Sequence, residues 1–286
     1  MKDLYEDFNS KYCYKNTNIL INKLDIREYK ELSKYEAKIT AAKSLGLRLK
    51  GITGNFDKKH YLSIHNYLFE DIYPFAGKLR EENISKGEFR FASFEYVEPE
   101  LERILEQLKK ENFLEGTSKK QLAERLAYYL SELNVLHPFR EGNTRTTAVF
   151  FIKYLRTLGY DVTNDIFAEN AWYFRNALVR ANYNDLKNDI HATTEYLELF
   201  LRNLLLGEDN ILSNRSMHIS HKLDKKVDIQ TSEVDIDAKK VDIEYICKDK
   251  IPHITPKSIQ HIIKMYDKYT TVGCFGRSDI IALLNL

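Results

Sequence analysis

Apolar residues recur at helical spacing along most of the first 206 residues of the chain. Stretches with apolar side chains at positions i, i+3, i+4 and i+7 predict helices near residues 32–49, 61–72, 101–108, 122–133, 144–158, 165–180 and 189–206. Asp57 and Ser118 precede the second and fourth stretches at N-cap positions, and Gly159 follows the fifth at the C′ position. The pattern therefore predicts an all-α domain over residues 1–206.

One segment of this domain departs from helical spacing. Within residues 84–92, Phe89 and Phe91 alternate with charged neighbours after a Lys-Gly turn. Alternation after a turn is typical of a short hairpin. We therefore expect one small β-hairpin, at 84–91, in an otherwise helical fold.

The pattern changes after Gly207. Residues 207–254 lose the helical stripe and contain three Val-Asp-Ile triplets, which are too few to define a repeat architecture. This part is predicted to be a linker or short strands. Apolar residues return at helical spacing in 255–286, which predicts a small helical C-terminal segment.

Composition and charge narrow the class of protein. The 43 basic and 42 acidic residues leave a net charge of +1, which excludes a globally basic nucleic-acid binder and an acidic tail. The three cysteines are odd in number and far apart, so they predict neither a disulfide framework nor a metal knuckle. The N-terminus is polar, and no apolar run approaches the roughly 18 residues of a membrane span. We expect a cytoplasmic protein with no membrane partner.

The segment HPFREGNTR, residues 137–145, carries the clearest chemical signal and lies between two predicted helices. Asn143 is expected to be the N-cap of the second helix, whose free amides form an anion site suited to phosphate, with Arg145 on the first turn. A carboxylate beside phosphate, here Glu141, is repelled unless a cation such as Mg²⁺ bridges them. His137 has the side chain whose ordinary pKa suits a general base near pH 7.

HPFREGNTR resembles the signature of the Fic family, HPFx(D/E)GN(G)R, at eight of nine positions. The upstream run GNFDKKHYLSIHNYLFEDIYPFAGKLR, residues 54–80, and INKLDI, residues 21–26, are also similar to that family. The likeness covers roughly residues 14–205. It implies a Fic-fold helical bundle whose hairpin at 84–91 is the family's flap, which aligns a segment of the target protein by adding it as a strand.

The resemblance also implies an activity: AMP transfer from ATP to a Ser, Thr or Tyr hydroxyl of a target protein. By family role, His137 deprotonates the hydroxyl and Glu141 holds Mg²⁺ between the α- and β-phosphates. Gly142 and Asn143 cradle the phosphates, and Arg145 neutralises the outer ones.

Further residues are assigned around this core. The cofactor-binding set is completed by Thr144 and by Phe139, which is also expected to anchor the loop from a buried position. Asn182 and Tyr183 are candidates for adenine contacts by position alone.

Two departures from the family pattern bear on phosphate binding and control. Thr144 replaces the usual glycine, and Ala148 stands where a second arginine is common, which leaves Arg80 or Arg90 as candidates for the γ-phosphate. No glutamate followed by Gly or Asn has Ser or Thr four residues earlier, so the family's inhibitory motif (S/T)xxxE(G/N) is not encoded. Control is then expected from a small inhibitory partner protein, from a homo-oligomer, or from no plug of the active site.

Alternatives stay open at this point. One is a Doc-like protein phosphotransferase, in which the nucleotide binds reversed and the γ-phosphate moves. Another is a nucleotide-binding transcriptional regulator with weak catalysis, because the segment 255–286 resembles the opening helices of a winged helix-turn-helix and leaves DNA as a partner open. The segment is equally compatible with a helical cap on the Fic domain.

Overall fold

The computed structural model describes residues 10–50, 52–86, 89–162, 167 and 170–219. Its helices are α1 (Tyr29–Lys50), α2 (Lys58–Phe69), α3 (Val97–Lys110), α4 (Lys119–Leu136), α5 (Asn143–Thr157), α7 (Ala171–Arg180) and α8 (Glu195–Leu206). Short 3₁₀ turns are η1 (Phe94–Tyr96), η2 (Asn112–Leu114), η3 (Leu186–Asn188) and η4 (Arg215–Met217). The strands β1 (Ser85–Lys86) and β2 (Phe89–Arg90) pair antiparallel, with Ser85 opposite Arg90. The predicted all-α fold with one hairpin is confirmed.

Local signals set several of the helix ends. Asp57 accepts a hydrogen bond from the His60 N–H at the start of α2. Ser118 and Gln121 form a reciprocal capping box at the start of α4. Gly159 follows the C-cap of α5 with a φ of 82°, which is the left-handed conformation that favours glycine. These three predicted caps are confirmed.

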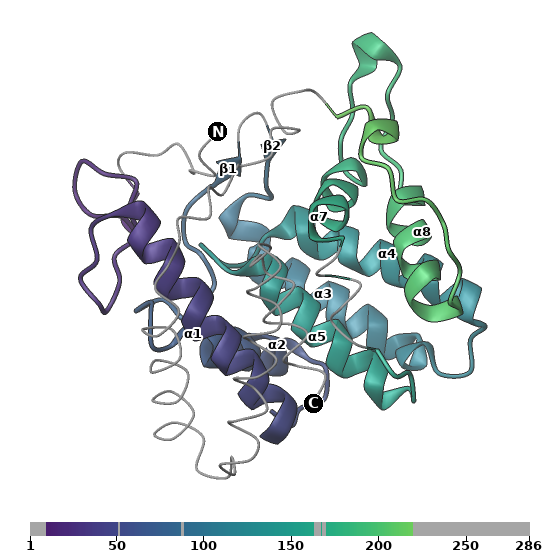
Figure 1. Ribbon diagram of the computed structural model, residues 1–286, viewed down its shortest axis with the longest axis horizontal. Helices are drawn as coiled ribbons and strands as arrows, with labels where there is room; N and C mark the ends of the chain where they lie inside the picture. The colour runs from purple at the N-terminus through teal and green to yellow at the C-terminus, as the bar shows by residue number, and fades with distance from the viewer. Residues whose placement is uncertain (1–9, 51, 87–88, 163–166, 168–169, 220–286) are drawn as a thin grey trace, which may run out of the picture.

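Helices α4 and α5 lie in the middle of the molecule (Figure 1). Helix α4 packs against α3, α5, α7 and α8, and α5 packs against α2, which in turn contacts α1. One continuous core of buried apolar side chains joins these helices, with Tyr61, Ile64, Leu108, Ala127 and Phe150 fully buried. The connection between α4 and α5 is thereby held on a rigid frame.

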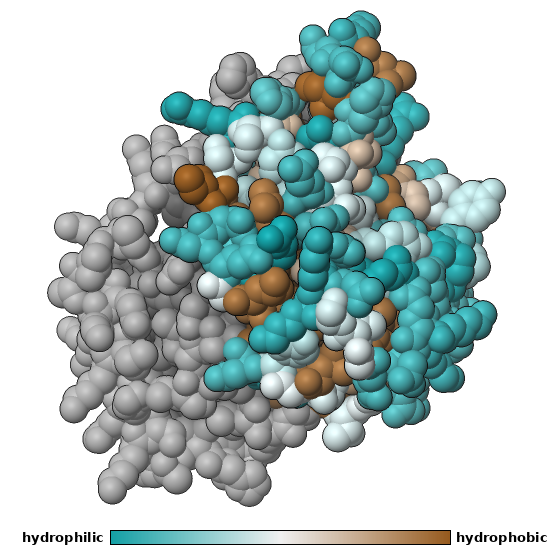
Figure 2. All heavy atoms as spheres, turned by 90° about the vertical axis from the view of Figure 1, so that its right-hand side faces the viewer, coloured by the Kyte–Doolittle hydropathy of each residue, from teal (hydrophilic) through white to brown (hydrophobic). Residues whose placement is uncertain are grey.

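The face that carries α8 is mostly hydrophilic (Figure 2). Hydrophobic residues of the described part of the chain form separate small patches in this view, as is usual for the surface of a globular domain. Along the parts of the chain that the structure describes, no helix combines the length and the apolar character needed to cross a membrane.

The chain continues to pack against the domain beyond α8. Met217 and Ile219 are buried in the core, and the Asn176 side chain donates to the Asn214 side chain. The packed part of the chain therefore extends at least to residue 219, past the boundary predicted at 206. The remainder of the predicted linker and the helical segment 255–286 lie outside the described residues, and the division into domains stays a prediction.

Candidate active site

The motif segment is the tight connection between two central helices. Helix α4 ends at Leu136 and α5 begins at Asn143. His137 and Gly142, at the two ends of the connection, both have a positive φ, 47° and 82°. The chain therefore reverses in six residues and places the base candidate at the C-terminus of α4, next to the N-terminus of α5.

Glycine is required at position 142 for two reasons. Its φ of 82° is costly for any residue with a side chain, and a Cβ built there would lie 2.2 Å from the Phe69 Cζ. Gly142, and not Asn143, is the N-cap of α5, so the predicted capping role of Asn143 is wrong. The Asn143 side chain instead accepts the Phe139 N–H (2.8 Å) and donates to the Phe139 carbonyl (2.7 Å). The Asn143 side chain thus holds the conformation of the turn through two hydrogen bonds to the backbone of one residue.

Phe139 anchors this turn in the core. Its ring is fully buried and stacks on Tyr61, with centroids 5.6 Å apart, and on His65, with centroids 3.7 Å apart. The anchoring role agrees with the sequence. The Phe139 side chain has no exposed surface, and the assignment of Phe139 to the cofactor-binding residues stays a prediction.

His137 is buried and neutral. Its Nδ1 lies 3.3 Å from the Asn134 carbonyl, which can only accept, so this contact assigns the ring proton to Nδ1 and a lone pair to Nε2. Phe91 of the hairpin stacks on the ring, with centroids 3.8 Å apart. Burial, with the charges of Arg80 and Arg140, lowers the pKa of His137 to about 3. His137 is 9% exposed, so its imidazole does not keep the ordinary pKa of a solvated side chain, and its role as the base stays a prediction.

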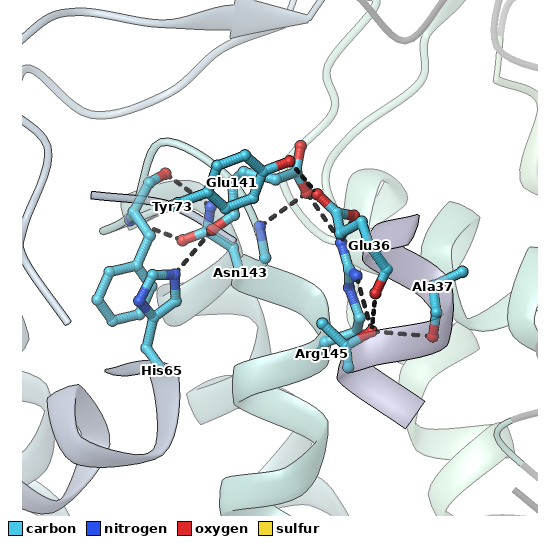
Figure 3. A network of polar contacts seen from close by, with 10 residues as sticks. Glu36, Ala37, His65, Tyr73, Glu141, Asn143 and Arg145 are labelled. Atoms are coloured by element: carbon cyan, nitrogen blue, oxygen red, sulfur yellow. Dashed lines mark hydrogen bonds and ion pairs between the residues drawn. The ribbon is translucent and has the colours of Figure 1, made fainter. Parts of the chain in front are cut away.

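On the other side of the turn, Arg145 lies among acidic side chains (Figure 3). Its guanidinium pairs with Glu36 of α1 and with Glu141, whose carboxylate is 3.2 Å away, and donates to the Thr40 hydroxyl. The Tyr73 hydroxyl donates to Glu36. The Glu141 carboxylate also accepts the Gly142 N–H at 2.7 Å.

These charges influence one another. Loss of hydration and the nearby Glu36 carboxylate raise the pKa of Glu141. Burial disfavours the charged form of Arg145, but Glu36 and Glu141 outweigh it and raise the pKa of the guanidinium. Two carboxylates beside one guanidinium leave an excess of negative charge, which a divalent cation would neutralise.

A Mg²⁺ ion at this turn would depend on Glu141. Among the described residues, no group of three or more His, Cys, Asp and Glu side chains could hold a metal ion. Mg²⁺ usually binds one or two carboxylates and completes its shell with waters and substrate phosphates. Glu141, with 31% of its side chain exposed beside the α5 N-terminus, fits that mode.

Four residues of this network were missed from the sequence: Glu36, Thr40, His65 and Tyr73. His65 of α2 accepts the Gly77 N–H at Nδ1 (2.8 Å), so its Nε2 carries the proton and donates to the Glu141 carbonyl (2.9 Å). It thereby fixes the backbone of Glu141. Glu36 is one of two acidic residues of α1, with Glu31, and only the tertiary packing distinguishes it.

The candidates for adenine and γ-phosphate contacts are placed as follows. The Asn182 amide donates to Ser131 of α4, at both the carbonyl and the hydroxyl. Arg80 is 2% exposed and donates to backbone carbonyls, so it is not a γ-phosphate ligand in this arrangement. Arg90 is exposed on β2. Thr144 lies in the first turn of α5, and Tyr183 follows α7 with its N–H bonded to the Arg180 carbonyl.

A model of the Fic/DOC family matches residues 55–155, which include α2, the hairpin and the whole α4–α5 turn. The chain is 33% identical over 172 residues to the probable protein adenylyltransferase Fic of Escherichia coli, covering 60% of this chain and 85% of that protein. The chain belongs to the Fic/DOC family.

One further relative and one solved structure extend the comparison. The chain is 37% identical over 161 residues to the protein adenylyltransferase VbhT of Bartonella schoenbuchensis, covering 56% of this chain and 34% of VbhT. It therefore spans about a third of that relative's length. The N-terminal Fic domain of a VirB-translocated Bep effector protein of Bartonella quintana, solved with bound ADP, is 25% identical, with a TM-score of 0.58 and coverage of 68% of this chain and 93% of that domain.

Proposed function

We propose that this protein is a protein adenylyltransferase that moves AMP from ATP to a Ser, Thr or Tyr hydroxyl of a target protein. The observation that carries the proposal is the α4–α5 turn. It places the neutral imidazole of His137, the N-terminus of α5 and the Arg145 guanidinium in one short connection. The names of the relatives from E. coli and B. schoenbuchensis, and the ADP bound to the B. quintana domain, support the same reaction class.

The proposed step is an in-line displacement at the α-phosphorus. The target hydroxyl oxygen forms a bond to this phosphorus while its proton passes to the Nε2 lone pair of His137. The bond from the α-phosphorus to the bridging oxygen breaks, and pyrophosphate leaves with the electron pair. The fold's part in such a reaction is positioning and electrostatic stabilisation.

Each side chain has a defined task in this proposal. The amides in the first turn of α5 have no acceptor within the helix and would receive phosphate oxygens. Arg145 would neutralise the leaving pyrophosphate, which competes with Glu36 for the same guanidinium. Glu141 would hold Mg²⁺, which supplies charge neutralisation at the phosphates when bound. The negative charge of a bound nucleotide would also favour a protonated His137 and so raise the pKa of the imidazole from its low value.

The test separates nucleotide binding from transfer. The wild-type chain and His137→Ala are titrated with ADP by calorimetry, and each is incubated with Mg²⁺, ATP labelled at the α-phosphate and a cytosolic lysate. We expect equal ADP affinity and label on protein with the wild type only. Label of similar intensity with His137→Ala would contradict the assignment of the base.

A further inference from the structure

The hairpin is attached at both ends to the turn that carries His137. On the N-terminal side, the Arg80 N–H donates to the Pro138 carbonyl at 2.9 Å. On the C-terminal side, the Ala92 N–H donates to the Val135 carbonyl at 3.0 Å. The two segments that flank the hairpin therefore both donate hydrogen bonds to the same short stretch of backbone, residues 135–138.

The Arg80 side chain joins these parts a second time. Its Nε donates to the His137 carbonyl (2.8 Å) and its Nη2 to the Leu136 carbonyl (3.1 Å). Its Nη1 donates to the Glu82 carbonyl (2.7 Å) and its Nη2 also to the Ala92 carbonyl. Two acceptors thus lie where α4 ends and the catalytic turn begins, and two flank the hairpin.

The chemistry of guanidinium fits this position. The last carbonyls of a helix lack partners within the helix, and a buried carbonyl without a partner is costly. A guanidinium presents its donors in a planar, rigid fork, whereas an ammonium group is a compact donor that cannot reach four separated carbonyls in the same way. Arg80 is 2% exposed, so its donors are directed at the protein interior.

The conformation of His137 also needs an external support. A non-glycine residue at a φ of 47° is strained, and such residues persist where the surroundings over-determine them. The hydrogen bond from Arg80 to the His137 carbonyl acts on this strained residue directly. Phe91, the residue before Ala92, lies flat on the imidazole with an interplanar angle of 22°, so the hairpin also fixes the ring itself.

We propose that Arg80 is a positioning residue that couples the hairpin to the catalytic base. A target segment bound along the hairpin would be held in register with Nε2 of His137, because one guanidinium ties both parts together. This inference rests on the proposed function for the role of His137. Arg80 is buried and would set the geometry of transfer through the hairpin and the His137 backbone.

The experiment uses the full chain with Arg80→Met, Arg80→Lys and Phe91→Leu. The matched control is Arg103→Met, the same change at a half-exposed arginine of α3. ADP titration by calorimetry gives affinity and the number of sites per chain, which reports the folded fraction. Hydrogen–deuterium exchange at residues 89–92 reports attachment of the hairpin. Transfer of α-label to lysate protein is expressed per ADP-binding site.

For Arg80→Met we expect native ADP affinity and about tenfold faster exchange at 89–92. Transfer per binding site should fall about 100-fold, since a displacement near 1 Å can cost that much. Phe91→Leu should lower transfer without changing ADP affinity. The transfer by Arg80→Lys should lie between that of the wild type and that of Arg80→Met. Arg103→Met should transfer label as the wild type does.

Native exchange at 89–92 together with native transfer in Arg80→Met or Arg80→Lys would overturn the proposal. If Arg80→Met binds no ADP, and is therefore not folded, the test depends on Arg80→Lys and Phe91→Leu. Native transfer by both of these variants would then overturn the proposal. A wild-type chain that binds ADP but transfers no label would refute the proposed function instead. The exchange measurement would still decide whether Arg80 holds the hairpin.

Discussion

Replacement of Gly142 by alanine tests how tightly the catalytic turn is packed. Two costs apply to Gly142→Ala. A side chain at a φ of 82° costs about 1–2 kcal/mol, and a Cβ at 2.2 Å from the Phe69 ring forces the ring to move, which costs about 1–3 kcal/mol. The sum, about 2–5 kcal/mol, is a large fraction of the roughly 5–15 kcal/mol by which a domain is stable.

Gly159 provides a matched control. It has the same φ of 82°, but a Cβ there would meet no atom within 4 Å. Gly159→Ala should therefore lower the free energy of unfolding only by the backbone strain, about 1–2 kcal/mol. Urea unfolding of both variants gives the two free energies, and their difference isolates the contact with Phe69.

A double variant sharpens the test. Phe69→Leu should shrink the clash, so Gly142→Ala should cost less in that background than in the wild type, with a coupling of about 1 kcal/mol or more. Equal losses of stability for Gly142→Ala and Gly159→Ala, or no coupling with Phe69→Leu, would mean that the Phe69 ring does not exclude a side chain at position 142.

Other predictions follow from the same network. Glu36→Gln should tighten ADP binding about fivefold by calorimetry, because a carboxylate that pairs with Arg145 is removed and such a pair is worth about 1 kcal/mol; weaker binding would mean that Glu36 positions the guanidinium. Burial lowers the pKa of His65 and of His137 to about 3. Below pH 6.5 both histidines therefore become protonated in the unfolded chain while they stay neutral in the folded chain. Stability is then complete above pH 6.5 and falls as the pH falls, by up to about 1.4 kcal/mol per pH unit for each histidine; equal urea midpoints at pH 5 and pH 7 would contradict this. Ser118→Ala should cost about 1 kcal/mol in the same unfolding assay, through loss of the capping box, and an unchanged midpoint would count against that cap.

The helices could be predicted because their signals are local. Apolar spacing identified α1 to α5, and the caps at Asp57, Ser118 and Gly159 depend on residues within one turn of each helix end. The start of α8 at Glu195 was predicted wrongly, because the predicted helix began at 189. Asp189 has a φ of 53°, and a β-bridge pairs Asp185 with Ile190. Turn chemistry there overrides the apolar pattern.

The site was predictable only as far as one contiguous motif reaches. The spacing of the motif residues between two helices places Glu141 beside Arg145, four residues later, and His137 at the other end of the same turn. The burial of His137 under Phe91 and the pairing of Glu36 with Arg145 follow from tertiary packing, with 109 residues separating that ion pair. No local pattern could reveal them.

In the proposed reaction the α-phosphate of ATP, and not the γ-phosphate, moves to protein. The most direct measurement incubates the wild-type chain with Mg²⁺ and lysate in two parallel reactions, one with ATP labelled at the α-phosphate and one with ATP labelled at the γ-phosphate. We expect protein-bound label from the α-labelled ATP alone. Protein-bound label from the γ-labelled ATP would contradict adenylyl transfer and assign the chain to phosphoryl transfer.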